Sequence, residues 1–128
     1  MSHTVTLSAP SLLRDYYRVL TAGPEAFGAG EPLRVLLSEH LDFTGSLAGH
    51  IPDATDRFLI GVAGFIATVR EITVISEVHD ADKSAILYDA DLPGGTVRFA
   101  EFFTFRGGVI ESLTLHYDGS DYLAKGGR

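Results

Sequence analysis

The fold of this chain is decided by one stretch in its second half, Val97-Arg98-Phe99-Ala100-Glu101-Phe102-Phe103-Thr104-Phe105. Aromatic and β-branched residues favour extended strands. Side chains alternate between the two faces of a strand, so Glu101 is predicted to share one face with Phe99 and Phe103. The stretch therefore predicts a strand that carries a single acid on its most apolar face.

The surroundings of Glu101 decide what that acid does. Burying an ionised carboxylate is costly unless it is hydrogen-bonded, paired or protonated. Two interpretations follow. Either Glu101 belongs to a functional site, where burial raises its pKa, or it reaches a rim or pairs with an arginine such as Arg57, Arg70 or Arg98, and an arginine partner lowers its pKa.

The rest of the chain predicts helices first and strands later. Apolar spacing predicts helices between Ser8 and Gly23, over 32–39 and over 54–69, with Asp53 as the N-cap of the last. Strands are predicted at 41–48, 72–78, 84–92, 96–105 and 109–117. This order is typical of an α+β domain in which three helices pack on a curved, mixed or antiparallel sheet of about five strands.

Composition narrows the class of protein. The chain has 128 residues, no cysteine and a net charge of −7. We expect one domain over 1–128, with flexible ends at 1–8 and 124–128. The acidic balance and scattered basic residues argue against nucleic acid or a membrane as partner. No signal-peptide pattern or long apolar run is visible, so a cytoplasmic location is expected.

Two further segments carry a family resemblance: Phe43-Thr44-Gly45-Ser46-Leu47-Ala48-Gly49 before the long helix, and the run from Ala100 to Glu111 with its Gly107-Gly108 turn. With the element order, they make the chain similar to the nuclear-transport-factor-2-like (NTF2-like) superfamily, within it the SnoaL-like and ketosteroid isomerase-like group. The resemblance covers roughly Leu12 to Asp118. It implies a cone-shaped fold whose sheet encloses an apolar pocket for a small hydrophobic molecule. Because this fold hosts isomerases, cyclases, dehydratases, hydrolases and pure binding modules, it implies the fold more strongly than the reaction.

The resemblance also implies which residues line the pocket. Besides Tyr16 and Glu101, these are Phe58, Val62, Tyr88, Phe99, Phe103, Leu113, Leu115 and Tyr117. A set of this kind suits a small-molecule site, although aromatic residues at such positions also form ordinary core.

Tyr16 and Glu101 resemble the oxyanion donors of ketosteroid isomerases, where a tyrosine acts beside a carboxylic acid kept neutral by its apolar site. Those isomerases also need a carboxylate base before the long helix. The corresponding run here, from Phe43 to Ser46, has no acid, so steroid isomerisation is not predicted.

Asp118 and His50 are the remaining candidates for a catalytic base. Asp118 ends the last predicted strand, where it either accepts a proton at the pocket mouth or begins a turn with Gly119. His50 precedes the long helix and is either a base at the pocket rim or a solvated side chain. The histidines lack the spacing of metal ligands, and no cofactor motif is visible, so neither a metal nor a cofactor is expected.

Two functions are compatible with these residues. One is a cofactor-independent proton-transfer enzyme of the isomerase, cyclase or dehydratase type. The other is a non-catalytic ligand-binding or dimerisation module. Phe102 is predicted on the opposite strand face from Glu101, and an apolar residue there indicates a homodimer through the outer face of the sheet.

Overall fold

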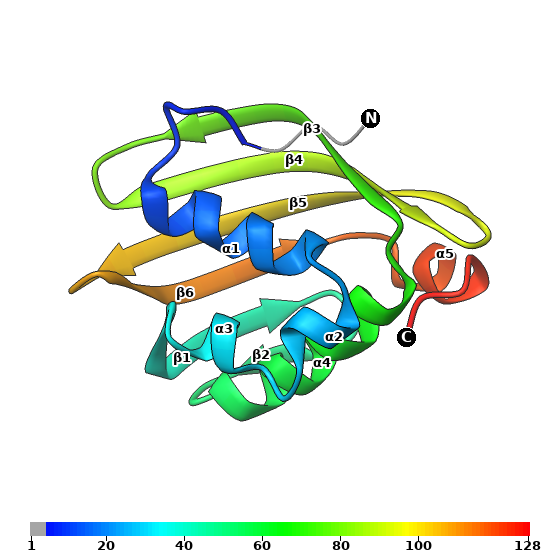
Figure 1. Ribbon diagram of the computed structural model, residues 1–128, viewed down its shortest axis with the longest axis horizontal. Helices are drawn as coiled ribbons and strands as arrows, with labels where there is room; N and C mark the ends of the chain where they lie inside the picture. Colours follow the sequence, from blue (N-terminus) through cyan, green and yellow to red (C-terminus); the bar gives the residue numbers. More distant parts are fainter. Residues whose placement is uncertain (1–4) are drawn as a thin grey trace.

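The computed structural model describes residues 5–128 of the chain. Figure 1 shows a curved sheet with helices gathered on one of its faces. The helices are α1 (Ser11–Thr21), α2 (Pro24–Phe27), α3 (Glu31–Arg34), α4 (Thr55–Thr68) and α5 (Gly119–Ala124); the strands are β1 (Leu37–Gly45), β2 (Gly49–Ile51), β3 (Glu71–His79), β4 (Lys83–Leu92), β5 (Gly95–Arg106) and β6 (Val109–His116).

The six strands form one mixed sheet in the order β2-β1-β6-β5-β4-β3. Strands β3 to β6 are joined by short turns and pair antiparallel. Strand β1 pairs parallel with β6, so it joins the first half of the chain to the end of the second. The predicted α+β architecture with a curved mixed sheet is confirmed.

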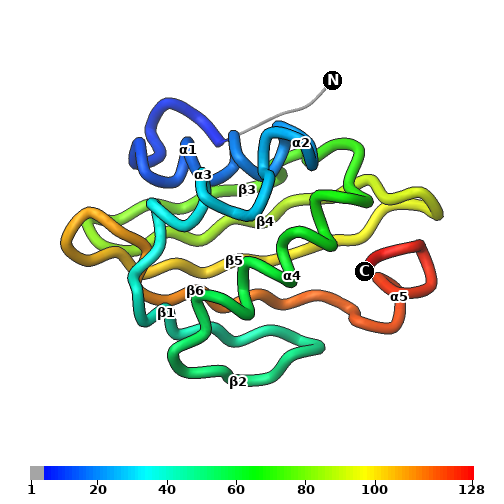
Figure 2. Tube along the Cα trace, turned by 60° about the horizontal axis from the view of Figure 1, so that its bottom comes forward, coloured from blue at the N-terminus to red at the C-terminus, as the bar shows by residue number. Residues whose placement is uncertain are grey.

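Helices α1 and α4 cover the concave face of the sheet, as Figures 1 and 2 show. Helix α1 buries Leu13, Tyr16, Tyr17 and Leu20 on one side, because these residues recur at helical spacing. Helix α4 buries Phe58, Val62 and Ile66 among others on its side toward the sheet. The core lies between these two helices and the sheet.

The convex face of the sheet carries a cross-strand row of four residues, three of them apolar. Val78, Ala85, Phe102 and Thr114 are direct partners on β3, β4, β5 and β6, so they lie on the same face. Val78 is 67% exposed and Phe102 is 48% exposed.

Several local predictions were wrong. The helix predicted over 32–39 ends at Arg34, and β1 begins at Leu37. Ala54, not Asp53, is the N-cap of α4. Asp53 has a φ of 55°, and its Oδ1 lies 2.6 Å from Nδ1 of His40. Strand β2 and helix α5 were not predicted, because each is too short to show a periodic pattern.

The last residues of the chain, predicted to be flexible, make ordered contacts. The Gly127 amide donates to the Tyr122 carbonyl at 2.8 Å, and the Tyr122 hydroxyl donates to the Arg128 carbonyl at 3.0 Å. At the other end, part of the predicted flexible segment 1–8 lies outside the described residues. Within it, the Thr6 amide donates to Glu77 at 3.1 Å. No helix within residues 5–128 has the length and apolarity needed to cross a membrane.

Candidate functional site

Glu101 lies on β5 with its side chain turned to the concave face, and it is only 2% exposed. The Tyr16 hydroxyl donates to Oε2 of Glu101 at 2.9 Å. The Tyr17 hydroxyl donates to Oε1 at 2.6 Å. Each carboxyl oxygen is therefore held by its own tyrosine, and both tyrosines come from consecutive positions of α1.

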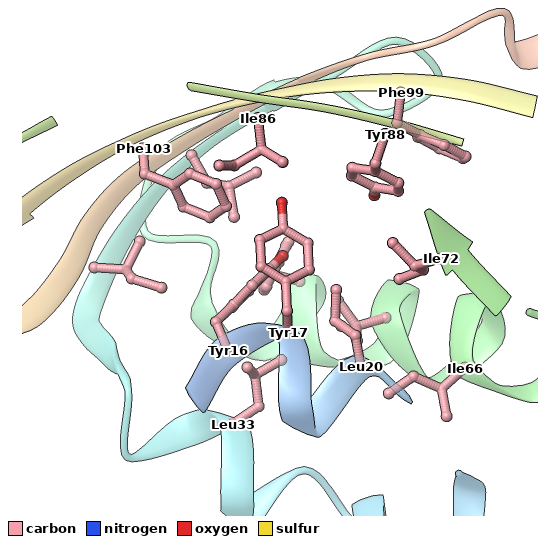
Figure 3. Packing of buried hydrophobic residues seen from close by; sticks show 14 of the residues in the cluster. Tyr16, Tyr17, Leu20, Leu33, Ile66, Ile72, Ile86, Tyr88, Phe99 and Phe103 are labelled. Carbon is pink, nitrogen blue, oxygen red and sulfur yellow. The ribbon is translucent and has the colours of Figure 1, made fainter. Parts of the chain in front are cut away.

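Aromatic packing fixes the two tyrosines in this position. Figure 3 shows Tyr16 and Tyr17 rising from α1 toward the sheet, which carries Phe103 and Tyr88. The Tyr16 ring meets Tyr17 and Phe103 edge to face, with centroids 5.1 and 5.2 Å apart. The Tyr17 ring meets Tyr88 in the same manner at 5.8 Å. Such contacts orient α1 so that both hydroxyls reach the acid.

Burial dominates the electrostatics of the site. It raises the pKa of Glu101 to about 7, although the hydroxyls of Tyr17, Tyr16 and Tyr88 act in the opposite direction. The pKa values of these three tyrosines are raised far above 10, first by burial and then by the charge of Glu101. The tyrosines therefore remain donors, while Glu101 changes its protonation near neutral pH.

The alternative that Glu101 pairs with an arginine was wrong. Its hydrogen-bond donors are tyrosines. Arg98, the neighbouring arginine on β5, instead binds Asp89 with its Nε at 2.8 Å from Oδ1.

An apolar cavity of about 240 Å³ opens beside Glu101. Helix α4 forms one wall and the concave face of the sheet forms the other. The lining residues are Tyr16, Leu20, Phe43, Leu47, Ala48, Ile51, Arg57, Phe58, Gly61, Val62, Phe65, Tyr88, Phe99, Glu101, Leu115, Tyr117, Tyr122 and Arg128. Glu101 is the one acid in this lining, so the cavity presents an apolar space with a single carboxyl at its wall.

The structure places most of the predicted pocket residues on this cavity: Phe58, Val62, Tyr88, Phe99, Leu115 and Tyr117. Phe103 and Leu113 do not line it, and they are 1% and 0% exposed in the solid core. The physical reason is that Phe103 packs against the tyrosine rings of α1, and Leu113 is its direct partner on β6. The cavity therefore ends next to Glu101, and beyond it the cone is filled by packed side chains such as Phe103 and Leu113.

Of the four predicted catalytic residues, the structure brings together only Tyr16 and Glu101. His50 does not line the cavity; it is exposed, with Nε2 2.6 Å from Oδ1 of Asp42. Asp118 does not line it either, and its carboxylate accepts from the Asp121 amide at 3.0 Å as the N-cap of α5. Neither residue is placed to act as a base toward a molecule in the cavity.

Sequence reasoning missed several residues of the site. Tyr17 was not among the predicted site residues, although its hydroxyl makes the shorter bond to Glu101. Tyr122 and Arg128 line the cavity from a segment without a periodic pattern. Arg57 was considered only as a partner for Glu101. Arg57 lies one helical turn before Gly61, which also lines the cavity, so its helical spacing could have predicted that it lines the cavity too.

The described part of the chain holds no cluster of three potential metal-ligating side chains. His79, the last residue of β3, is largely buried. Its Nε2 lies 2.7 Å from Glu77 and its Nδ1 2.8 Å from Ser84.

Similarity to known proteins rests on the fold. A protein from Kribbella flavida shares 21% sequence identity over 94% of each chain, with a TM-score of 0.77. An NTF2-like protein of unknown function from Cytophaga hutchinsonii shares 19% identity over 96% of this chain and 99% of its own, with a TM-score of 0.68. A Catenulispora acidiphila protein with a ketosteroid isomerase-like fold, in complex with trimethylamine, shares 19% identity over 92% and 93% of the two chains, with a TM-score of 0.66.

No family model matches the sequence, and no curated protein matches it. The chain has the NTF2-like, ketosteroid isomerase-like fold.

Proposed function

We propose that this protein is a cofactor-independent proton-transfer enzyme that acts on a small apolar or cyclic molecule. One observation carries the proposal: the Glu101 carboxyl is buried on the wall of an apolar cavity, and hydroxyl groups hold both its oxygens. A general acid–base group works best when its pKa lies near the operating pH. Glu101, with a pKa of about 7, meets that condition.

The proposed reaction moves a proton next to a carbonyl group. The Glu101 carboxylate takes a proton from the carbon beside the carbonyl, and the electrons of the broken C–H bond form an enolate. The Tyr16 hydroxyl lines the cavity, so it is the donor that can turn from Oε2 to the developing oxyanion. The protonated Glu101 then returns the proton to the same carbon or to a conjugated one.

Tyr17 has a different role in this proposal. It does not line the cavity, and its 2.6 Å bond holds Oε1 of Glu101 from the helix side. We therefore assign Tyr17 as a positioning residue, which keeps the carboxyl in place while the Tyr16 hydroxyl moves.

The direct test is exchange of carbon-bound protons. Cyclohexanone in D₂O would be followed by proton NMR with the wild-type protein and with Glu101→Gln. We expect the wild type to accelerate loss of the α-proton signal by about 10²-fold or more and Glu101→Gln to lose this acceleration. Glu25→Gln, which changes an exposed acid on α2, is the matched control. Equal rates for wild type and Glu101→Gln would reject the proposal.

A binding module without turnover is the second candidate. It is favoured by the tyrosine bonds to both Glu101 oxygens, and by Phe43 on the cavity wall where an isomerase-like base would be expected. This candidate predicts that cyclohexanone binds without any exchange that depends on Glu101.

We also propose that the protein forms a homodimer through the convex face of the sheet and works in the cytoplasm. The row that contains Val78 and Phe102 supplies exposed apolar surface for such a contact.

A further inference from the structure

Two arginines stand out on the cavity lining, which is otherwise almost entirely apolar. Arg57 comes from the first turns of α4, and Arg128 comes from the segment after α5. Both side chains are exposed at the cavity, whereas Glu101 is buried deep in it. The protein as a whole has a net charge of −7, so these two arginine side chains are opposite in sign to the molecule as a whole.

The acids nearest to Arg57 in sequence are already engaged by other partners. Asp53 binds His40 at 2.6 Å, and Asp56 binds Arg34 at 2.8 Å. Within residues 5–128, no hydrogen bond or ion pair is found for the guanidinium of Arg57 or of Arg128. Both groups therefore keep their full donor capacity for a ligand.

The backbone of Arg128 lies directly against Gly64 on α4, where a side chain would not fit. A Cβ atom added at Gly64 would lie 2.7 Å from the Arg128 carbonyl oxygen. Positions 57 and 64 are two helical turns apart, so about 10 Å of helix separates them. The end of the chain lies beside α4 (Figure 2), and both Arg57 and Arg128 line the cavity that this helix borders.

From this arrangement we infer that the substrate carries an anionic group, such as a carboxylate, which Arg57 and Arg128 bind at the cavity mouth while its apolar body reaches Glu101. This inference rests on the proposed function and names the substrate class of the same site. Guanidinium groups present planar, fork-like donors that match a carboxylate. Anchoring one end of the substrate at the mouth would fix which carbon faces the acid, and such positioning lowers the barrier to reaction.

Three probes with one ring system test the inference: 2-naphthoate, its neutral near-isostere 2-naphthamide, and 2-naphthylmethylammonium. Binding would be measured by isothermal titration calorimetry at pH 7.5. We expect 2-naphthoate to bind about 10-fold more tightly than 2-naphthamide, and this ratio to shrink at high salt because the arginines are exposed.

Variants locate the effect. Arg57→Gln and Arg128→Gln should each reduce the ratio, and the double variant should bring it to about 1 with 2-naphthamide affinity unchanged. Gly64→Ala should also reduce it, because it displaces the Arg128 backbone without changing any charge. Arg106→Gln, which removes an exposed arginine that does not line the cavity, is the matched control and should leave the ratio unchanged.

Failure of the inference can be told apart from failure of the proposed function. A ratio near 1 in the wild type, or preference for the ammonium probe, overturns the anionic class, while exchange of cyclohexanone protons by Glu101 would still stand. Absence of binding by all three probes overturns the inference as well. A ratio that persists in the double variant also rejects it, because the preference would then not come from these arginines.

Discussion

Replacing Glu101 by glutamine should remove a specific pH dependence from the stability of the protein. The folded carboxyl has a pKa of about 7, against an ordinary value of 4.5. Between these two pH values the folded chain keeps a proton that the unfolded chain has released. Raising the pH therefore favours the unfolded state, and the free energy of unfolding falls across this window.

The size of the effect follows from the two pKa values. From 4.5 to about 7, at about 1.4 kcal/mol for each pH unit, the wild type should lose roughly 3 kcal/mol relative to Glu101→Gln. The amide is close in shape and stays uncharged at every pH. Any constant cost of the substitution cancels when the two pH dependences are compared.

The assay is urea unfolding followed by far-ultraviolet circular dichroism at intervals from pH 4 to 8.5, because the chain has no tryptophan for fluorescence. The difference in unfolding free energy between Glu101→Gln and the wild type should be flat below pH 4.5, change up to about pH 7 and be flat again above. Glu25→Gln should follow the wild type throughout. Parallel curves for wild type and Glu101→Gln would refute the reasoning, since they would mean that Glu101 titrates alike in the folded and unfolded chains.

Further substitutions test other parts of the structure. Tyr17→Phe removes a hydroxyl that lowers the pKa of Glu101, so the pH at which the infrared carboxyl band of Glu101 is half-lost should rise. The free energy of unfolding at pH 8 should fall by about 1–3 kcal/mol. An unchanged titration midpoint would contradict this. Gly61→Ala should stabilise the protein by about 0.5–1 kcal/mol in urea unfolding, because nothing lies within 4 Å of the added Cβ, and a loss of stability would show that the helix cannot accept it. Asp118→Ala should cost about 1 kcal/mol through the lost N-cap of α5, while cyclohexanone exchange stays at the wild-type rate; a lost rate would restore Asp118 as a catalytic candidate. Phe102→Lys should convert the proposed dimer to monomer in light scattering after gel filtration, and an unchanged mass would exclude the convex face as the interface.

The strand that carries Glu101 shows how much of the site could be predicted. Alternation along one strand needs no tertiary information, so the shared face of Phe99 and Glu101 followed from sequence order alone. The partner of the acid did not follow in this way. Tyr16 and Tyr17 both belong to the buried stripe of α1, and which hydroxyl reaches which oxygen depends on how the helix is rotated over the sheet.

Short and irregular segments set the other limit. A three-residue strand and a six-residue helix carry too few residues for a periodic signal, so β2 and α5 were missed, and with α5 the contribution of Tyr122 to the cavity. Asp53 has the residue type of an N-cap, but its backbone is left-handed and its carboxylate contacts His40 instead of the helix. The positions of β2, α5 and Asp53 depend on contacts with distant parts of the chain, which a local sequence pattern does not contain.

The parallel pairing of β1 with β6 has a consequence for how the protein acquires its binding capacity. Partners such as Phe43 and Leu113, about 70 positions apart, must meet before the sheet is complete. Contacts of that sequence separation form slowly, because a long loop must close first. Since the cavity is lined by residues from both sides of the β1–β6 pairing, a molecule that binds only the complete cavity would stabilise this pairing.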